Sequence, residues 1–379
     1  MAKAGSAEAK EDRTMKFTVK REKLQKALQR VGSIIGARSM LPLLGNVLIE
    51  AGSEGLKLCT TDLDIRITTT VEAEVSESGR STVPARRLAS LVASFSADTI
   101  DFSVDDKDHF KISCGTGRFT LLGLPAADFP EPAEFDGIRE LKLKESEFKR
   151  MITAIGYAVS ADDSRKVLTG VLMNCHDSIL TMVATDGKRM AMQERAPEVF
   201  NGEDGDAIVP LKAVNETKRL LEGSEPVSIV FGEKQCLFKG ANFELTTKLI
   251  EGNYPNFRQV IPTVCKREIE IPVEPFLKKI ETVSRLLSES SSYIILNFEP
   301  GKMSIQGSSS EFGEGSDSID ISFDGEPFEV SFNPAYLADP MRVTGCENIK
   351  LKVNDPLTPV TMEADEGFLY VIMPIRKKA

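Results

Sequence analysis

Several residue types that carry chemistry are scarce in this sequence. The 379 residues include no tryptophan and only two histidines, His109 and His176, each in a polar stretch that is typical of a solvated surface side chain. A catalytic site built on histidine is therefore not expected. The six cysteines are scattered without close pairs and without zinc-type spacing, so we expect reduced thiols, no metal site and no cofactor.

Long apolar runs and an export signal are also missing. No stretch approaches the length that spans a bilayer, and no signal peptide precedes the first apolar segment. We therefore expect no membrane association and a cytoplasmic location. Residues 1–14 are small, polar and charged, and they are expected to form a disordered N-terminal extension.

What the sequence does contain is one pattern written three times. Each copy has a strand-like segment, an amphipathic helix built on an apolar anchor, short alternating runs typical of half-buried strands, and a proline suited to the start of a second helix. The anchors are Leu24, Phe148 and Phe276, and the prolines are Pro84, Pro210 and Pro334. In the third copy, Pro340 is expected to end the second helix after about two turns.

The repeat decides the predicted architecture. The chain is too long for one ordinary core, and its landmarks recur in register. We predict an α+β protein of three domains, each with two helices and antiparallel sheets, at residues 15–138, 139–264 and 265–379.

Two copies carry a Thr-Asp pair at the same position of the repeat, because Thr61 and Thr185 each follow their anchor by 37 residues. An Asx-type turn, in which the carboxylate accepts backbone N–H groups, is the favoured interpretation of Asp62 and Asp186. The alternative is a nucleic-acid-processing enzyme that binds Mg²⁺ through Asp62, Asp64 and Asp186. The turn is favoured because these acids belong to different predicted domains and the third copy lacks the pair.

Positive charge is concentrated in the predicted helices. The net charge is −10, but the six helices together sum to +10, which leaves −20 for the rest of the chain. Lys26, Arg150 and Lys278 occur two residues after the three anchors, so they point away from the buried side. Solvated helix faces are often basic, yet such a face would carry acids at these positions about as often. A repeated basic face on an acidic protein predicts a surface for a polyanion.

The chain resembles a known family over residues 15–379, the bacterial DNA polymerase III beta subunits, which are processivity sliding clamps. The resemblance rests on "MKFTV", "LPLLGNVLI", "TDLDI", "TVPAR", "LPAADFP", "VATDGKRMA", "KLIEGNYPNFRQVIP" and "YVIMPIR" in this order. It implies the DNA-clamp fold and a head-to-tail homodimeric ring without catalytic activity. It also implies that the ring encircles duplex DNA without sequence specificity and tethers the replicative polymerase, the clamp loader and other replication and repair proteins. The implied location is the cytoplasm, at replication forks on the nucleoid.

Three sets of site residues follow. For the DNA-facing inner wall we predict Lys23, Lys26, Arg30, Arg86, Arg87, Arg150, Lys212 and Lys278 from the charge pattern, and the resemblance adds Arg38. The resemblance implies an apolar cleft for partner peptides with a glutamine and a leucine-aromatic end, lined by Leu168, Thr185, Gly187, Lys188, Arg189, Met190, Pro255, Gln259, Val260, Asn333, Tyr336, Val371, Met373, Pro374, Ile375 and Arg376. The dimer interface is predicted at Phe119, Leu121, Leu286 and Leu287.

The cleft prediction has one structural consequence. The stretches "ATDGKRMA" at 184–191 and "YVIMPIRKKA" at 370–379 are expected to meet, although some 180 residues separate them. Neither is long enough to form a concave apolar floor alone. Lys188, where many relatives carry a histidine, and the tail beyond Arg376 are expected to modify peptide preference.

Overall fold

The structure is a computed structural model that describes residues 14–36, 41–223, 225–288, 293–364 and 367–376. Arg38 and most of the predicted extension 1–14 therefore lie outside the described residues. The chain forms two compact units: unit 1 contains Met1–Ser146 and Glu216–Lys248, and unit 2 contains Glu147–Asn215 and Leu249–Ala379. The chain passes between the units within α4 (Glu145–Ile155), within α5 (Leu211–Leu220) and after Lys248.

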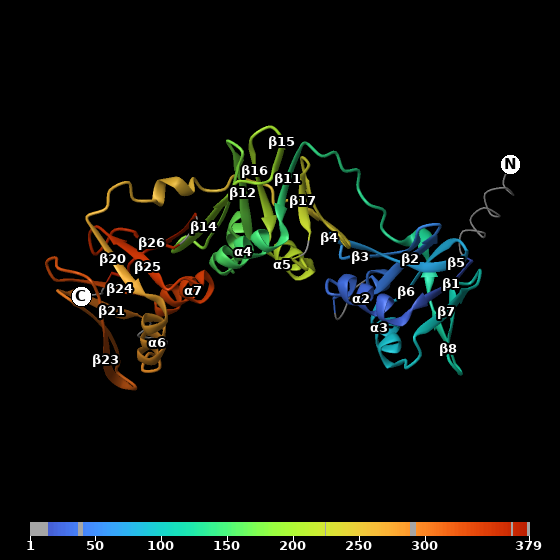
Figure 1. Ribbon diagram of the computed structural model, residues 1–379, viewed down its shortest axis with the longest axis horizontal. Helices are drawn as coiled ribbons and strands as arrows, with labels where there is room; N and C mark the ends of the chain where they lie inside the picture. The colour runs from blue at the N-terminus through green and yellow to red at the C-terminus, as the bar shows by residue number, and fades with distance from the viewer. Residues whose placement is uncertain (1–13, 37–40, 224, 289–292, 365–366, 377–379) are drawn as a thin grey trace. The chain divides into compact units, whose positions relative to one another are not determined.

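Unit 1 contains two helices that lie side by side against antiparallel strands (Figure 1). The helices are α2 (Arg21–Gly32) and α3 (Ala85–Ser94). The strands are β1 (Met15–Lys20), β2 (Asn46–Gly52), β3 (Gly55–Thr61), β4 (Ile65–Val71), β5 (Ala73–Glu77), β6 (Gly79–Pro84), β7 (Thr99–Val104), β8 (His109–Cys114), β9 (Gly117–Leu122), β10 (Leu124–Pro125), β11 (Arg139–Lys144), β17 (Pro226–Phe231), β18 (Gln235–Gly240) and β19 (Phe243–Lys248). One sheet has the order β5-β1-β7-β8-β9, and a second runs β10-β6-β2-β3-β4-β19-β18-β17-β11.

Unit 2 repeats this construction with the paired helices α6 (Val273–Ser284) and α7 (Pro334–Thr344) (Figure 1). Its strands are β12 (Gly170–His176), β13 (Ile179–Thr185), β14 (Arg189–Arg195), β15 (Val199–Gly202), β16 (Gly205–Pro210), β20 (Arg267–Pro272), β21 (Ile294–Glu299), β22 (Lys302–Ser309), β23 (Gly313–Asp320), β24 (Phe328–Phe332), β25 (Asn348–Val353), β26 (Val360–Glu363) and β27 (Phe368–Ile372). The sheets run β16-β12-β13-β14-β27-β26-β25-β20 and β23-β22-β21-β24.

The predicted strand-to-helix starts are confirmed in all three repeats, at β1–α2, β11–α4 and β20–α6. Each anchor is fully buried, since Leu24, Phe148 and Phe276 all have 0% exposure. In α2 the other buried residues are Ala27, Leu28 and Val31, which fall on the same face at a period near 3.6. Burial of such a stripe, rather than helix propensity, holds a helix of this length.

Two strand pairs join sequence-distant parts of the chain in the same way. In unit 1, β4 pairs with β19, with Ile65 opposite Thr247. In unit 2, β14 pairs with β27, with Met190 opposite Val371. The stretches around 184–191 and 370–376 therefore meet as predicted.

The prolines differ from the expectation in two respects. Pro84 and Pro210 close the preceding strands β6 and β16, one residue before their helices, and only Pro334 occupies the first turn. The prediction that Pro340 ends the last helix is wrong, because α7 continues to Thr344. Proline leaves the carbonyl four residues earlier without its helical N–H donor, and here the Tyr370 hydroxyl donates to the carbonyl of Tyr336 at 2.8 Å. That substitute bond lets the helix tolerate the proline.

Among the helices that the structure describes, none is both long enough and apolar enough to cross a membrane.

Candidate functional site

A hollow of about 250 Å³ lies in unit 2 where β14 meets β27. We call it the cleft. Ten of the predicted cleft residues line it: Leu168, Thr185, Gly187, Lys188, Arg189, Met190, Pro255, Val260, Val371 and Met373. Arg165, Asn256 and Phe257 also line it and were not predicted.

The wall of the cleft is the turn that follows β13. The Asp186 carboxylate accepts the backbone N–H groups of Lys188 at 2.8 Å and Arg189 at 3.0 Å, and the Thr185 hydroxyl accepts that of Gly187 at 3.1 Å. This is the predicted Asx turn. Gly187 has φ 86°, and a Cβ there would lie 2.8 Å from the guanidinium of Arg165. Glycine adopts this left-handed backbone without strain, and a larger residue would also require the Arg165 guanidinium to move.

The floor of the cleft is apolar and preformed. Met190 and Val371 are each 2% exposed and pack in one cluster with Phe257. Met373, in contrast, is 41% exposed at the rim, and its N–H donates to the Lys188 carbonyl at 2.9 Å. The cleft thus offers a fixed base and one adaptable thioether side chain at its edge.

Behind the wall, Arg189 is held on all sides. Its guanidinium contacts Asp186 at 3.1 Å and Asp339 at 2.5 Å, and donates to the Tyr157 carbonyl at 2.8 Å. It also stacks over the ring of Tyr336 at 4.3 Å. Since the side chain is only 10% exposed, this network connects the cleft to α7 and fixes the turn.

Burial shapes the ionisation of this network. Burial disfavours the charged guanidinium, but the hydrogen bonds and charge interactions with Asp339 and Tyr370 together outweigh it and raise the pKa of Arg189. Burial also raises the pKa of Tyr157 and of Tyr370. Arg189 therefore stays charged and both phenols stay neutral in any ordinary buffer.

The remaining predicted cleft residues lie outside the lining: Gln259, Asn333, Tyr336, Pro374, Ile375 and Arg376. Asn333 caps α7, accepting the N–H of Ala335 at 2.9 Å, and Tyr336 acts through its stacking on Arg189. Arg165 escaped prediction because it lies in a short 3₁₀ segment, Asp163–Thr169, at a non-helical φ of −113° and ψ of 71°. No hydrophobic period marks such a segment, and its one sequence signal is the capping Asp162.

The Thr-Asp turn of unit 1 has the same backbone role. The Asp62 carboxylate accepts the N–H groups of Asp64 at 3.1 Å and Ile65 at 2.7 Å. Within the described residues, no three His, Cys, Asp or Glu side chains are grouped so that they would hold a metal ion. Asp62 and Asp186 therefore hold turns, and Asp64 pairs with Lys248 at 3.1 Å.

The predicted basic positions lie on the solvent side of their helices. Lys26, Arg150 and Lys278 are exposed while the anchors two residues earlier are buried, as the helical period requires. The other predicted positions that the structure describes are exposed at Lys23, Arg86, Arg87 and Lys212 and half-buried at Arg30. Some of these side chains are engaged: Lys23 pairs with Glu72, Arg30 pairs with Glu222, and Arg86 donates to the Ile35 carbonyl at 2.8 Å.

The predicted interface residues lie next to sheet edges. Phe119 and Leu121 belong to β9, which is the last strand of its sheet, and Phe119 is 40% exposed. Leu286 and Leu287 follow α6 and cover two glycines, because a Cβ on Gly315 would lie 2.4 Å from Leu286 and one on Gly307 would lie 3.2 Å from Leu287. The strand that carries Gly315, β23, is also an edge strand.

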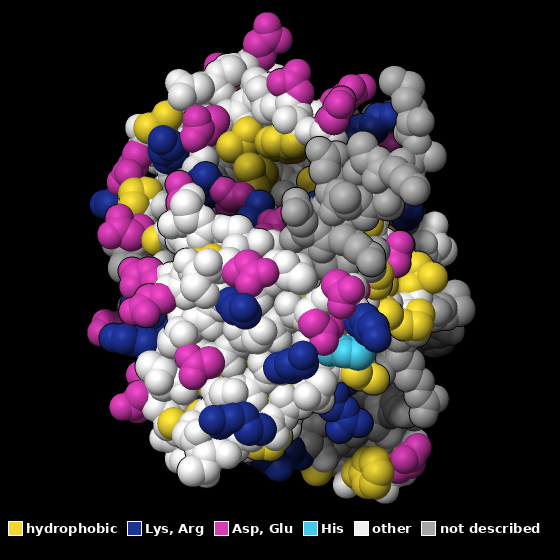
Figure 2. Space-filling model, turned by 90° about the vertical axis from the view of Figure 1, so that its right-hand side faces the viewer, with side chains coloured by type: hydrophobic (Ala, Val, Ile, Leu, Met, Phe, Trp, Pro, Cys, Tyr) yellow, Lys and Arg dark blue, Asp and Glu magenta, His cyan; other side chains and the backbone are white. Residues whose placement is uncertain are grey.

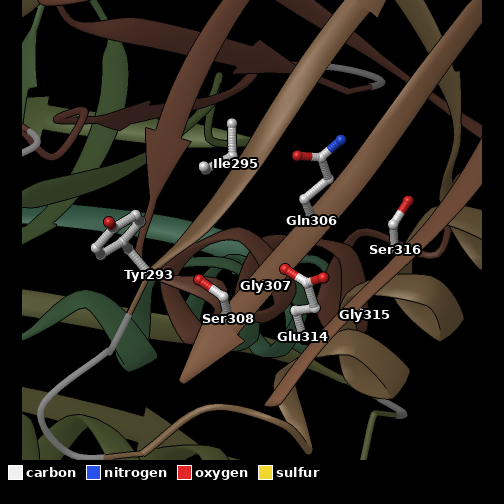
Figure 3. Close-up of a pocket in the computed structure, with 8 residues that line it drawn as sticks. All are labelled: Tyr293, Ile295, Gln306, Gly307, Ser308, Glu314, Gly315 and Ser316. Carbon is white, nitrogen blue, oxygen red and sulfur yellow. The ribbon is translucent and has the colours of Figure 1, made fainter. Parts of the chain in front are cut away.

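Two other surfaces lack the character of the cleft. Figure 2 shows one face of the molecule on which basic and acidic side chains interleave, without one large area of a single sign. Figure 3 shows a hollow on β21–β23 that is lined by polar groups such as Gln306, Ser308, Glu314 and Ser316. Neither provides an apolar floor comparable to that of the cleft.

Three α+β repeats with buried helix anchors, basic helix faces and an apolar cleft define a protein of the DNA-clamp class. Three family models of the DNA polymerase III beta subunit match consecutive parts of the chain. The N-terminal domain matches residues 15–133, the central domain matches 142–256 and the C-terminal domain matches 258–376. The chain belongs to this family, the beta sliding clamps, which are non-catalytic processivity subunits of DNA polymerase III.

Individual relatives agree over almost the whole chain. The beta sliding clamp of Caulobacter vibrioides is 33% identical over 374 residues, covering 96% of this chain and 100% of the relative. That of Chlamydia muridarum is 30% identical over 362 residues, covering 96% and 99%. The crystal structure of the DNA polymerase III subunit beta from Pseudomonas aeruginosa superimposes with a TM-score of 0.91 at 31% identity, covering 96% of this chain and 100% of that one.

Proposed function

We propose that two copies of this chain close head to tail into a ring that encircles duplex DNA and slides along it without reading sequence. The observation that carries this proposal is that the first helix of each repeat has an exposed basic residue at the same position, two residues after the buried anchor. These residues are Lys26, Arg150 and Lys278, in a protein of net charge −10. Phosphates attract such faces through counterion release, which carries no sequence information, while the acidic remainder repels DNA elsewhere. Retention then comes from topology rather than from affinity.

Circular DNA tests this proposal directly. The clamp loaded onto nicked circular DNA should stay bound through gel filtration and should be released when the circle is linearised. Replacement of Lys26, Arg150 and Lys278 by Glu should reduce loading several-fold without lowering the melting temperature, since all three side chains face solvent. Equal loading by this triple variant would show that the DNA-facing surface is elsewhere.

For ring closure, we propose that the edge strand β9 of one protomer pairs with β23 of the next. Unpaired edges are otherwise templates for aggregation, and Phe119 and Leu122 leave apolar surface on β9 at 40% and 67% exposure. Phe119→Glu should convert the dimer into a monomer of 41.6 kDa in analytical ultracentrifugation at micromolar concentration. A wild-type chain that sediments only as that monomer would contradict the ring.

For partners, we propose that the cleft binds short peptides of the replicative polymerase, the clamp loader and other replication proteins. Burial of a leucine and an aromatic side chain on the Met190 and Val371 floor would contribute roughly 3–6 kcal/mol before ordering costs, which by itself corresponds to an affinity between the millimolar range and tens of micromolar. We further propose the three-domain division at 15–138, 139–264 and 265–379 and a cytoplasmic site of action.

The rim methionine gives the cleanest test of the cleft. Met373 is exposed, so Met373→Ala should weaken the binding of a peptide that contains a glutamine and ends in leucine-phenylalanine by about tenfold. The melting temperature should stay unchanged. Met190 is buried in the floor, so its replacement by Ala is expected to destabilise the fold by about 2–5 kcal/mol and is a poor probe. If Met373→Ala binds the peptide with unchanged affinity, the docking site does not lie in the cleft.

A further inference from the structure

Unit 1 contains a second hollow built to the same plan as the cleft. It measures about 470 Å³ and lies between the first Thr-Asp turn, the segment 130–135 and strands β18 and β19. We call it the linker pocket. It stands beside the β4–β19 pair as the cleft stands beside β14–β27. Its turn has the same closing bond, since the N–H of Asp62 donates to the Ile65 carbonyl at 3.1 Å.

Leu63 is the unusual residue of this pocket. It has φ 78°, in the left-handed region, at the turn position where the cleft has Gly187 at φ 86°. A branched side chain there is strained, and this one is also 47% exposed at the pocket. An apolar side chain that is both strained and exposed adds nothing evident to the fold, whereas it adds an anchor surface to the pocket.

The opposite wall is apolar and held in place. Pro132 and Phe135 come from the segment after β10, and Leu237 comes from β18. The Arg66 guanidinium donates to the carbonyl of Pro130, and Phe135 lies so near Gly232 that a Cβ there would be 3.2 Å from the ring. The walls are therefore preformed, as a docking site requires.

The surroundings of the linker pocket are more acidic than those of the cleft. The lining of the linker pocket carries the acids Asp64, Glu131 and Glu244 and the bases Arg66 and Lys248, whereas the described lining of the cleft carries Arg165, Lys188 and Arg189 and no acid. Glu134 and Asp136 add two further exposed carboxylates in the segment 130–137, which contains no base.

The ion pairs around the pocket are weak. Asp64 pairs with Lys248 at 3.1 Å, Glu131 with Arg80 at 3.8 Å and Glu244 with Lys239 at 2.8 Å. All three pairs are solvent-exposed, so a partner's cations can replace their bases at little cost.

We propose that the linker pocket is a second docking site, which takes a short extended segment of a partner protein with an apolar side chain flanked by lysine or arginine. The apolar side chain packs between Leu63 and Pro132, and the flanking cations face Asp64 and the acids of 130–137. Charge complementarity then directs basic segments to the linker pocket and acidic ones to the cleft.

The test uses fluorescent pentapeptides on the full-length chain. The probe is Lys-Leu-Lys-Phe-Lys, and its matched controls are Lys-Gly-Lys-Gly-Lys and Glu-Leu-Glu-Phe-Glu. We expect the probe to bind at least tenfold more tightly than either control. Leu63→Gly should remove this preference without lowering the melting temperature, because glycine relieves the left-handed strain. Met373→Ala should leave probe binding unchanged.

A second variant keeps the test decisive if Leu63→Gly alters the turn. Glu131→Lys with Glu134→Lys leaves Leu63 in place and should weaken the probe at least fivefold. Equal binding of the probe and Lys-Gly-Lys-Gly-Lys, or loss of the probe in Met373→Ala, would overturn the proposal. Binding of single-stranded DNA or self-association that disappears in Leu63→Gly would assign the pocket to those occupants instead. Loading on circular DNA is measured separately, so failure here leaves the clamp function untouched.

Discussion

The turns Thr61–Arg66 and Thr185–Met190 share a backbone but not a chemistry. In each, an Asp carboxylate accepts two backbone N–H groups and the third residue adopts a left-handed conformation. The side chains then diverge, with Leu63, Asp64 and Ile65 in one turn and Gly187, Lys188 and Arg189 in the other. The carboxylate is thus a constant that holds the turn, while the next three residues set the apolar and charged character of the adjoining hollow.

The largest expected difference between the two turns concerns their arginines. Arg189→Ala should lower the free energy of unfolding by about 3–5 kcal/mol, because Asp186 and Asp339 lose the buried guanidinium that they share and only the more exposed Arg342 still pairs with Asp339, at 3.2 Å. Arg66→Ala removes part-buried bonds to the Pro130 carbonyl and the Cys59 thiol and a contact with the Phe129 ring, and should cost about 1–2 kcal/mol. Urea unfolding of both variants measures this, and equal losses would mean that the network around Arg189 adds no stability.

The next largest effect is expected from the strands that pair beside the two turns, β27 and β19. Tyr370 lies two residues after Phe368 in β27, where β19 has Leu245 two residues after Phe243. Tyr370→Phe should cost about 1–3 kcal/mol, because the Tyr336 carbonyl loses its donor. Pro340→Ala restores a helical N–H to that carbonyl, so the double variant should lose less than the sum of the single ones. Strictly additive losses would contradict this account of why α7 continues past Pro340.

The left-handed positions should respond with opposite signs. Gly187→Ala should destabilise by about 1–2 kcal/mol, because alanine is strained at φ 86°, and it should weaken peptide binding, because the new Cβ displaces the Arg165 guanidinium that lines the cleft. Leu63→Gly should stabilise by up to about 1 kcal/mol, because it relieves the strain at φ 78°. Melting curves of the two variants measure the signs, and a shift in the same direction would show that the turns are not equivalent.

The smallest expected effect is a pH dependence of stability that comes from Asp162, which caps the 3₁₀ segment carrying the cleft residue Arg165. Its carboxylate accepts the N–H of Ser164 at 2.9 Å, and this bond lowers the pKa of Asp162 below its ordinary value near 4. A depressed folded pKa gives stability that is present above about pH 4 and is lost as the pH falls through the folded pKa. Asp162→Asn keeps an acceptor oxygen, so its melting temperature should fall less between pH 5 and pH 3. Parallel curves for the two proteins would contradict this.

Much of the architecture was readable from pattern, because burial and helical period act locally. Leu24, Phe148 and Phe276 are buried, and the bases two residues later are exposed. The Thr-Asp turns were readable for the same reason, since an Asx turn needs only three or four neighbouring residues. Local pattern failed at Pro340, where the compensating donor, Tyr370, is 30 residues away in sequence.

The cleft was predicted in part, by resemblance rather than by pattern. Its central predicted residues line the cleft, whereas Pro374, Ile375 and Arg376 are not among the lining residues. Arg165 and the linker pocket had no counterpart in the sequence analysis, because each depends on where an irregular segment lies against a distant strand.

By itself the sequence determined the buried anchors, the exposed bases and the two Asx turns, because each follows from spacings within about four residues, and it determined the three repeats through landmarks that recur in register. Local pattern did not decide that β14 lies against β27 and β4 against β19, since side-chain alternation sets which face of a strand is buried but not which strand it pairs with, and only the resemblance indicated the first of these contacts. Tertiary structure alone decided the different characters of the two hollows, because Leu63 becomes an exposed, strained anchor only once its turn is folded against the segment 130–135.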